Sequence, residues 1–182
     1  MALYTSKYPP AYNSTYVKAT TDLGPGFYPY LACDPSKSVL GAGSGNSWMS
    51  NGVNTNQRFH IDLGAAFIIR RLYFENYHNS GADTDGGVKN FTLQGSNSAT
   101  AFATLTYATN TDWTDLTTSI SQLTQHPASN IADPQYALVT NTTAYRYYAL
   151  KFADDWGNAY MAIRRVELQI EQGGNVIIWS SE

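Results

Sequence analysis

The residue types that could do chemistry are scattered along this chain and form no catalytic motif. The 182 residues include three histidines and many serines and aspartates, so triads arise by chance. There is no Gly-x-Ser-x-Gly elbow, no His-Glu-x-x-His pair and no cluster of His and Cys. His60 falls between Phe59 and Ile61, where we expect local pairing on the polar side of a strand. A glycosidase carboxylate pair stays open from spacing alone, but nothing selects one.

Two loop sequences resemble ion or phosphate sites and lack the residues that complete them. Asp83-Thr-Asp85-Gly86 matches the start of an EF-hand loop, but Gln94 stands where the closing Glu belongs, and no helices flank it, so we interpret it as a turn. Within the Gly/Ser-rich stretch 36–47, the segment GAGSGNS at 41–47 is not followed by the Lys-Ser/Thr pair of a phosphate loop. Cys33 is the only cysteine, which excludes an intrachain disulfide and a thiolate metal cluster.

The elements that must position any site are short strands. In Arg58–Leu63, Phe59, Ile61 and Leu63 alternate with His60 and Asp62, which predicts a strand with one apolar side; Gly64 then breaks the chain. The phase slip near Arg164 predicts a bulge in the last core strand. No helix of ordinary length is visible, so the expected fold is an all-β antiparallel β-sandwich or jelly roll. Further strands are predicted at Tyr16–Thr21, Phe67–Phe74, Val88–Gln94, Phe102–Tyr107, Ala137–Thr140, Tyr145–Phe152 and Tyr160–Glu171.

Length and composition predict one domain and exclude some partners. We expect an irregular lead-in over 1–15, a sandwich over 16–171 and a strand-like tail over 172–182. Charged residues make up 14% of the chain and the net charge is −3, which offers no footprint for nucleic acid or an anionic membrane surface. No segment has the length for membrane insertion, and the N-terminus lacks the apolar run of a signal peptide.

Aromatic residues also make up 14% of the chain, including 14 tyrosines. Such a composition is common in β proteins that bind polar ligands, although Tyr is also simply a good strand residue. Glycines and prolines in Leu23–Tyr30 forbid regular structure there. Phe27, Tyr28 and Tyr30 are therefore loop aromatics, either binding platforms or plugs that fold back onto the core.

Six short motifs occur in a familiar order. An Ala-x-Asp segment ending at Asp34 and a Trp-x-Ser starting at Trp48 precede FHIDLG at 59–64. VKNFTLQGSN at 88–97, YRYYALKF at 145–152 and WGNAYMAIRRVEL at 156–168 follow. Over roughly 16–171 the chain resembles the discoidin, or coagulation factor V/VIII type C, domains of the galactose-binding-like superfamily. Its Pro-rich lead-in and its Tyr- and Asn-rich composition are most similar to versions of the domain found in phage tail and virion proteins.

The resemblance implies ligand binding by loops at one end of the sandwich, without catalysis. The matching loops are Leu23–Tyr30, Asn76–Gly87 and Asp154–Tyr160. An aromatic plate such as Trp156 suits the apolar face of a pyranose ring, while amides and imidazoles suit its hydroxyls. The alternative is that Trp156 packs inward and the polar residues only shape turns. The implied binding residues are Phe27, Tyr28, His78, Asn79, Trp156, Asn158 and Tyr160.

The resemblance also implies a structural Ca²⁺, with Asp34 and Glu167 at the matching positions. Calcium takes six or more oxygens, so two carboxylates alone do not make a site. The Gly/Ser-rich insertion after Asp34 departs from the family pattern, and Glu167 could equally face solvent or pair with an arginine.

The resulting functional expectation is a lectin-like module that binds a glycan or polysaccharide at a virion surface or outside the cell, and attaches a phage virion to its host. The alternative is a virion structural protein that uses the same fold only for contacts with other virion proteins or with itself. In that alternative, a partner would bury Phe27, Tyr28, Trp156 and the apolar tail Val176–Trp179.

Overall fold

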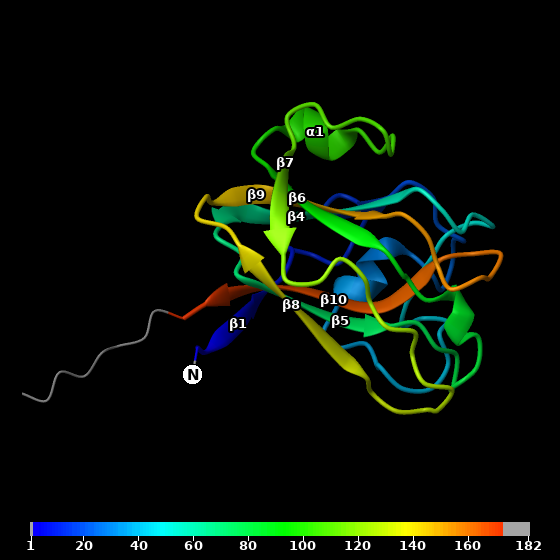
Figure 1. Ribbon diagram of the computed structural model, residues 1–182. Coiled ribbons are helices and arrows are strands. Elements are labelled where there is room, and N and C mark those ends of the chain that lie inside the picture. The colour runs from blue at the N-terminus through cyan, green and yellow to red at the C-terminus, as the bar shows by residue number, and fades with distance from the viewer. Residues whose placement is uncertain (1, 173–182) are drawn as a thin grey trace, which may run out of the picture.

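Residues 2–172, which the computed structural model describes, form two facing layers of antiparallel strands (Figure 1). One hydrogen-bonded path connects the strands in the order β1-β10-β5-β8-β7-β6-β9-β4-β2, and β3 pairs with β10 beside it. The path passes between layers at β7, which pairs Leu116 with Leu93 of β6 and Thr117 with Thr140 of β8. The predicted all-β antiparallel sandwich is confirmed.

The strands and short helices have the following bounds. One layer contains β1 (Tyr4–Lys7), β10 (Ala162–Glu171), β5 (Arg71–Asn76), β8 (Pro134–Thr140) and the short β3 (Trp48–Met49). The other contains β2 (Val17–Ala19), β4 (Gln57–Phe67), β9 (Tyr145–Phe152), β6 (Phe91–Ser96) and β7 (Thr114–Thr118). Three short helices lie in the connections: η1 (Pro29–Cys33), η2 (Thr84–Gly86) and α1 (Ala99–Ala103).

The core lies between the layers and is built from the inward side of each strand. Phe59, Ile61 and Leu63 of β4 are buried there, as the alternation predicts. Trp48 of β3 is also fully buried, with its ring 5.5 Å from Phe59, centroid to centroid. Burial of such rings is the largest favourable term available to a fold of this kind.

The outward side of β4 is covered as well, which alternation alone does not predict. Helix α1 replaces the strand expected at Phe102–Tyr107, and the side chain of Ser98 caps it by accepting a hydrogen bond from the Ala101 amide. Phe102 and Trp113 pack there against β9. His60 therefore lies beneath a second apolar layer and is fully buried.

Several predicted boundaries differ in the structure. Strand β4 continues past Gly64 to Phe67, with a register shift against β9 after Asp62, and β5 begins at Arg71. Gly64 has φ +74° and lies against Pro10, so a glycine suits this irregularity. The lead-in is not wholly irregular, because Tyr4–Lys7 forms β1 along β10. The predicted bulge in β10 is confirmed, between Ile163 and Arg165.

The tail predicted over 172–182 lies outside the described residues from 173 onward. Within residues 2–172, no helix is long and apolar enough to cross a membrane.

Candidate functional site

Two of the three predicted loops, Asn76–Gly87 and Asp154–Tyr160, contact each other at one end of the sandwich. The Trp156 amide donates to the carbonyl oxygen of Asp85 at 3.0 Å. The Asn158 side chain donates through Nδ2 to Asp85 Oδ1 at 2.8 Å. The resemblance therefore predicts the proximity of these loops correctly.

Phe27 and Tyr160 join this contact by packing inward. Both half-buried rings lie against a small cluster of Met49, Tyr77 and Ala162. The Tyr160 ring meets Tyr77 edge-on, with 6.1 Å between centroids. Burial raises the pKa of Tyr160, and nearby carboxylates add to that shift. The main physical role of Phe27 and Tyr160 is to hold the loops together.

Trp156 is half-buried. Its exposure is thus intermediate between the two alternatives from the sequence, an exposed aromatic plate and a side chain packed inward. The ammonium of Lys89 lies 4.8 Å from the centre of its ring, in the range of a cation–π contact. Its Nε1 is buried and has no hydrogen-bond partner among the described residues. Part of the Trp156 side chain thus stays exposed, and Lys89 lies over its ring.

His78 and Asn79 take part mainly in contacts within the loops. His78 is 1% exposed and stacks on His126 with 4.2 Å between ring centroids. Its Nδ1 accepts from the Gly81 amide at 3.0 Å, so Nε2 carries the proton and donates to the Val39 carbonyl at 2.9 Å. Neither ring nitrogen is left for a ligand in this conformation, and burial lowers the pKa of the ring. The exposed Asn79 accepts a hydrogen bond from the Gly43 amide.

Tyr28 points elsewhere and lines a cavity of about 260 Å³ beside the edge strand β2. The rings of Tyr28 and Tyr30 stack with centroids 5.4 Å apart and planes inclined by 18°. Pro29 between them starts the helix η1 and restricts the backbone. Six further lining residues escaped the sequence-based site prediction: Ser14, Val17, Lys18, Ala19, Asp22 and Leu105.

The cavity combines apolar walls with one cation and one anion. Asp22 Oδ1 accepts from the Gly24 amide at 3.0 Å, a turn contact that fixes the carboxylate. Lys18 Nζ lies 4.7 Å from the centre of the Phe102 ring. Burial, then the proximity of Tyr28 and Asp22, raises the pKa of Tyr30. We call the cavity lined by Tyr28, Tyr30, Lys18 and Asp22 the tyrosine pocket.

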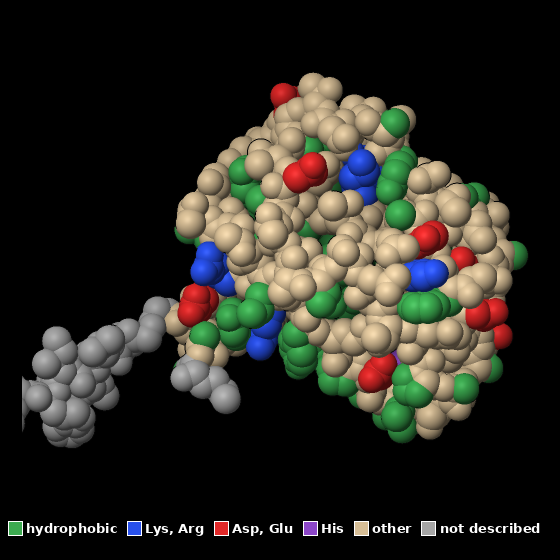
Figure 2. All heavy atoms as spheres, viewed as in Figure 1, with side chains coloured by type: hydrophobic (Ala, Val, Ile, Leu, Met, Phe, Trp, Pro, Cys, Tyr) green, Lys and Arg blue, Asp and Glu red, His purple; other side chains and the backbone are tan. Residues whose placement is uncertain are grey.

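The wider surface is weakly charged. On the face shown in Figure 2, acidic and basic side chains stand apart among neutral polar and apolar groups. This agrees with a charged content of 14%. A surface of this kind offers local contacts more than long-range attraction.

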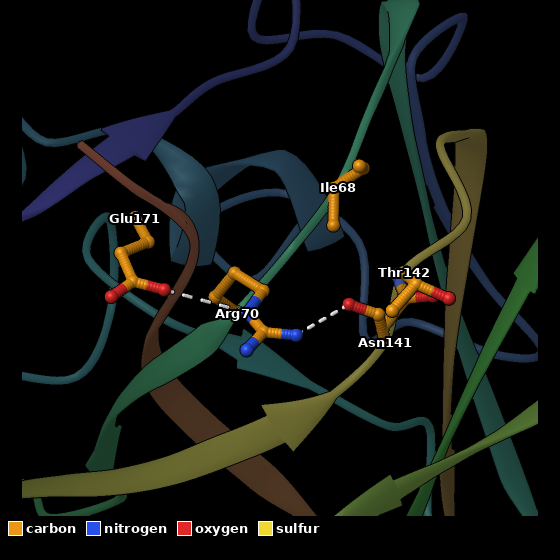
Figure 3. A pocket seen from close by; sticks show the side chains of 5 residues that line it. All are labelled: Ile68, Arg70, Asn141, Thr142 and Glu171. Carbon is orange, nitrogen blue, oxygen red and sulfur yellow. Dashed lines mark hydrogen bonds and ion pairs between the residues drawn. The ribbon is translucent and has the colours of Figure 1, made fainter. Parts of the chain in front are cut away.

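A second cavity, of about 320 Å³, lies at the other end of the sandwich, where β4 meets β5 and β8 meets β9. Figure 3 shows its lining side chains, with the Arg70 guanidinium between two partners. Arg70 Nη1 donates to the carbonyl oxygen of Asn141 at 2.6 Å, and its Nε lies 3.6 Å from a Glu171 carboxylate oxygen. Since its main polar groups already bind each other, this cavity is the weaker candidate.

The two carboxylates implied as calcium ligands are engaged by the chain's own donors. Asp34 Oδ1 accepts from the amide and hydroxyl of Ser36, at 2.9 and 2.7 Å. Glu167 accepts from the Ser6 hydroxyl at 2.5 Å, and its other oxygen lies 3.3 Å from Arg165 Nη1. Within residues 2–172, no three His, Cys, Asp or Glu side chains gather to hold a metal. Asp34 and Glu167 do not fit a shared Ca²⁺, because a guanidinium already neutralises Glu167.

Comparisons with solved structures find the same fold. A truncated AlyQ with CBM32 and alginate lyase domains matches with a TM-score of 0.59 and 18% identity, over 96% of this chain and 35% of that one. A chitosan-binding module from a chitosanase/glucanase of Paenibacillus sp. IK-5 matches with a TM-score of 0.57 and 16% identity, over 92% and 99%. The family 32 carbohydrate-binding module of Clostridium perfringens NanJ, in complex with galactose, gives 0.58 and 10%, over 92% and 100%.

These likenesses show that the chain shares the β-sandwich fold of these carbohydrate-binding modules, and they leave the ligand of this chain to be argued from its own residues. No protein-family model matches the chain, and no curated protein sequence matches it. Among the implied binding residues, Tyr28 lines a cavity and Trp156 stays partly exposed.

Proposed function

We propose that this chain is a non-catalytic carbohydrate-binding module and that its glycan site is the tyrosine pocket. The observation that carries the proposal is the stacked pair of Tyr28 and Tyr30 in a cavity that also contains Lys18 and Asp22. Apolar walls with a few convergent polar groups are the usual composition of small-ligand sites. The shared fold with carbohydrate-binding modules supports the same conclusion.

The pocket matches the two-sided chemistry of a sugar ring. A pyranose presents C–H groups on its face, which an aromatic ring such as Tyr28 can cover, and hydroxyls at its rim. Asp22 can accept hydrogen bonds from two of these hydroxyls, and Lys18 can donate to another. Because Pro29 and the stacking with Tyr30 already restrict Tyr28, little ordering entropy is lost on binding.

We further propose that such binding attaches the protein to cell-surface glycans. The expectation of a phage virion rests only on the Pro-rich lead-in and the Tyr- and Asn-rich composition of the sequence. The structure of the described residues gives no further support for it. The alternative, protein contacts only, would use Phe27, Tyr28, Trp156 and the tail Val176–Trp179, and the tail lies outside the described residues.

The test is a titration of the purified chain against oligosaccharides of several chemistries. Suitable first probes are the ligands of carbohydrate-binding modules with a similar structure: galactose, GalNAc-β-1,3-galactose, chitosan fragments and unsaturated mannuronic acid. A bacterial polysaccharide array extends the range. We expect binding that Tyr28→Ala weakens about tenfold or more. Tyr12→Ala, at an exposed tyrosine outside the pocket, serves as the matched control and should bind like the unmodified chain.

A parallel Trp156→Ala variant decides between the tyrosine pocket and the loop contact around Asp85. Loss of binding in Trp156→Ala with normal binding in Tyr28→Ala would move the glycan site to the Asp154–Tyr160 loop. No binding above background across the whole panel would contradict the proposed function.

A further inference from the structure

Arg164 is a buried cation whose guanidinium donates hydrogen bonds only to backbone carbonyls. It is fully buried, and the bulge in β10 leaves it without a register partner between Ile163 and Arg165. Bulges commonly redirect a side chain in this way. Here the redirected side chain enters the Gly/Ser-rich loop that follows Asp34.

Five carbonyl oxygens accept hydrogen bonds from this one guanidinium. Nη1 donates to Gly41 and His78, at 2.8 and 2.7 Å. Nη2 donates to the carbonyl oxygens of Ser38, Leu40 and Ala42, at 3.1, 2.8 and 3.3 Å. The positive φ of Gly41, +74°, helps the carbonyls of residues 40, 41 and 42 to face the same charge. We call these five oxygens the carbonyl cage.

The cage surrounds the guanidinium with no carboxylate in hydrogen-bond contact, although the nearby Glu75 carboxylate acts on the pKa of Arg164 in the opposite direction to burial. Among residues 2–172, the ion pairs involve Arg70, Arg146 and Arg165 but not Arg164. Burial of a charge without compensation is costly, and it lowers the pKa of Arg164 below its ordinary value. Oriented carbonyl dipoles supply the compensation that an acidic partner would otherwise give.

Several converging oxygens, many of them backbone carbonyls, are also what a hard divalent cation requires. The residues implied as calcium ligands, Asp34 and Glu167, are taken by other donors, whereas the cage beside them has the oxygens but is filled by an arginine. The cage joins the loop 38–42 to the loop that begins at Asn76, through His78. A cation at this point therefore fixes two loops of the fold.

We propose that the Arg164 guanidinium is a built-in replacement for a structural metal ion, and that the carbonyl cage is a latent site for a hard divalent cation such as Ca²⁺. Removing the side chain empties the cage and leaves its oxygens facing one another. Either a soluble guanidinium or a metal ion can then restore the missing positive charge. Calcium–oxygen distances of about 2.3–2.6 Å are shorter than the present contacts, so the loop contracts around the metal.

The experiment uses the full chain with Arg164→Ala, and compares it with Arg164→Met, which keeps volume without charge. Both variants should melt about 10 °C or more below the unmodified chain, since each loses the same charge–carbonyl contacts. Millimolar methylguanidinium or CaCl₂ should raise the melting temperature of Arg164→Ala and leave that of the unmodified chain unchanged.

Terbium luminescence reports directly on the emptied cage, because the Tyr77 ring lies against Gly43 of the same loop and can sensitise the ion. Saturable terbium emission, displaced by Ca²⁺, should appear in Arg164→Ala alone. Arg58→Ala is the matched control: Arg58 is equally buried but donates to only two backbone carbonyls, of Thr106 and Thr109. It should gain no terbium site.

Three outcomes would overturn the proposal. If Arg164→Met has the same melting temperature as the unmodified chain, the charge does not hold the loops together. Arg164→Ala gaining no stability from either cation would show that the cage does not need one. Rescue by methylguanidinium without terbium or calcium binding would contradict a latent metal site. If Arg164→Ala does not fold alone, refolding with and without CaCl₂ or methylguanidinium gives the same decision.

Discussion

Arg58 Nη1 lies 3.3 Å from His60 Nε2, and both side chains are fully buried. The other ring nitrogen of His60, Nδ1, is 2.9 Å from the carbonyl oxygen of Phe102. A carbonyl only accepts and a guanidinium only donates, so Nδ1 carries the proton and Nε2 accepts. This arrangement requires a neutral ring, and burial lowers the pKa of His60 to about 4.

The first prediction concerns stability against pH. Because the folded pKa of His60, about 4, is below its value of about 6.5 in an unfolded chain, the unfolded state binds the proton first. The stabilisation is complete above about pH 6.5, falls as the pH drops, and levels off below about pH 4. The loss attributable to His60 is about 3 kcal/mol in the free energy of unfolding.

Urea denaturation at a series of pH values measures this dependence. Burial also lowers the pKa of His78, so the curve of the unmodified chain contains both rings. His60→Gln keeps an acceptor for Arg58 but does not titrate, and the difference between the two curves isolates His60. An unchanged slope between pH 6.5 and 4 in His60→Gln would contradict the assignment.

The second prediction concerns the Tyr148 hydroxyl, which ties β9 to the connection between β4 and β5. It donates to the Phe67 carbonyl at 2.6 Å and accepts from the Ile69 amide at 3.4 Å. Tyr148→Phe should lower the free energy of unfolding by about 1–2 kcal/mol, because two buried backbone groups lose a partner. Tyr136→Phe, at a tyrosine that is 47% exposed, is the control and should change it little. Equal losses in the free energy of unfolding in both variants would contradict a stabilising role for the Tyr148 hydrogen bonds.

The third prediction concerns the close approach of β6 to Tyr145. A Cβ built on Gly95 would lie 2.4 Å from Tyr145 Cδ2, which is far inside contact distance. Gly95→Ala should therefore cost about 1–3 kcal/mol of stability through overpacking. Thr92→Ala, at an exposed position of the same strand, is the control. In chemical denaturation, Gly95→Ala should cost less stability when it is added to Tyr145→Ala than when it is added to the unmodified chain. An equal cost in both backgrounds would contradict the steric cause.

The sequence predicts best the elements whose pattern is local. Strand β9 has the predicted bounds, Tyr145–Phe152, because alternating bulky residues extend over its whole length. The bulge near Arg164 follows from a phase slip that is visible in the sequence. Helix α1 was missed, although Ser98 before an Ala-rich run is an N-terminal signal, because Phe102 also suits a strand.

Long-range partners account for most of what the sequence cannot predict. The sequence does not predict strand β1, because its partner among the described residues, β10, lies more than 150 residues further along the chain. The tyrosine pocket joins Asp22 and Tyr28 to Leu105, which no periodicity connects. The sequence does not predict that Arg58 and Arg164 are buried, because two acceptors of Arg58 and all those of Arg164 are backbone carbonyls, and a carbonyl leaves no mark in the sequence.

The fourth prediction uses Asp22 and Lys18 to determine the charge of the glycan. Asp22→Asn preserves an acceptor for the Gly24 amide, so the fold should be unchanged, but it removes the negative charge. For a neutral sugar, Asp22→Asn and Lys18→Gln should each weaken binding about five- to tenfold, because each replaces a charged hydrogen bond by a neutral one. Raising the salt concentration should then matter little. For a uronate, Lys18→Gln should weaken binding while Asp22→Asn strengthens it, and salt should weaken it. Calorimetric titration of both variants at two salt concentrations separates these cases, and equal affinity in all variants would place the sugar outside the tyrosine pocket.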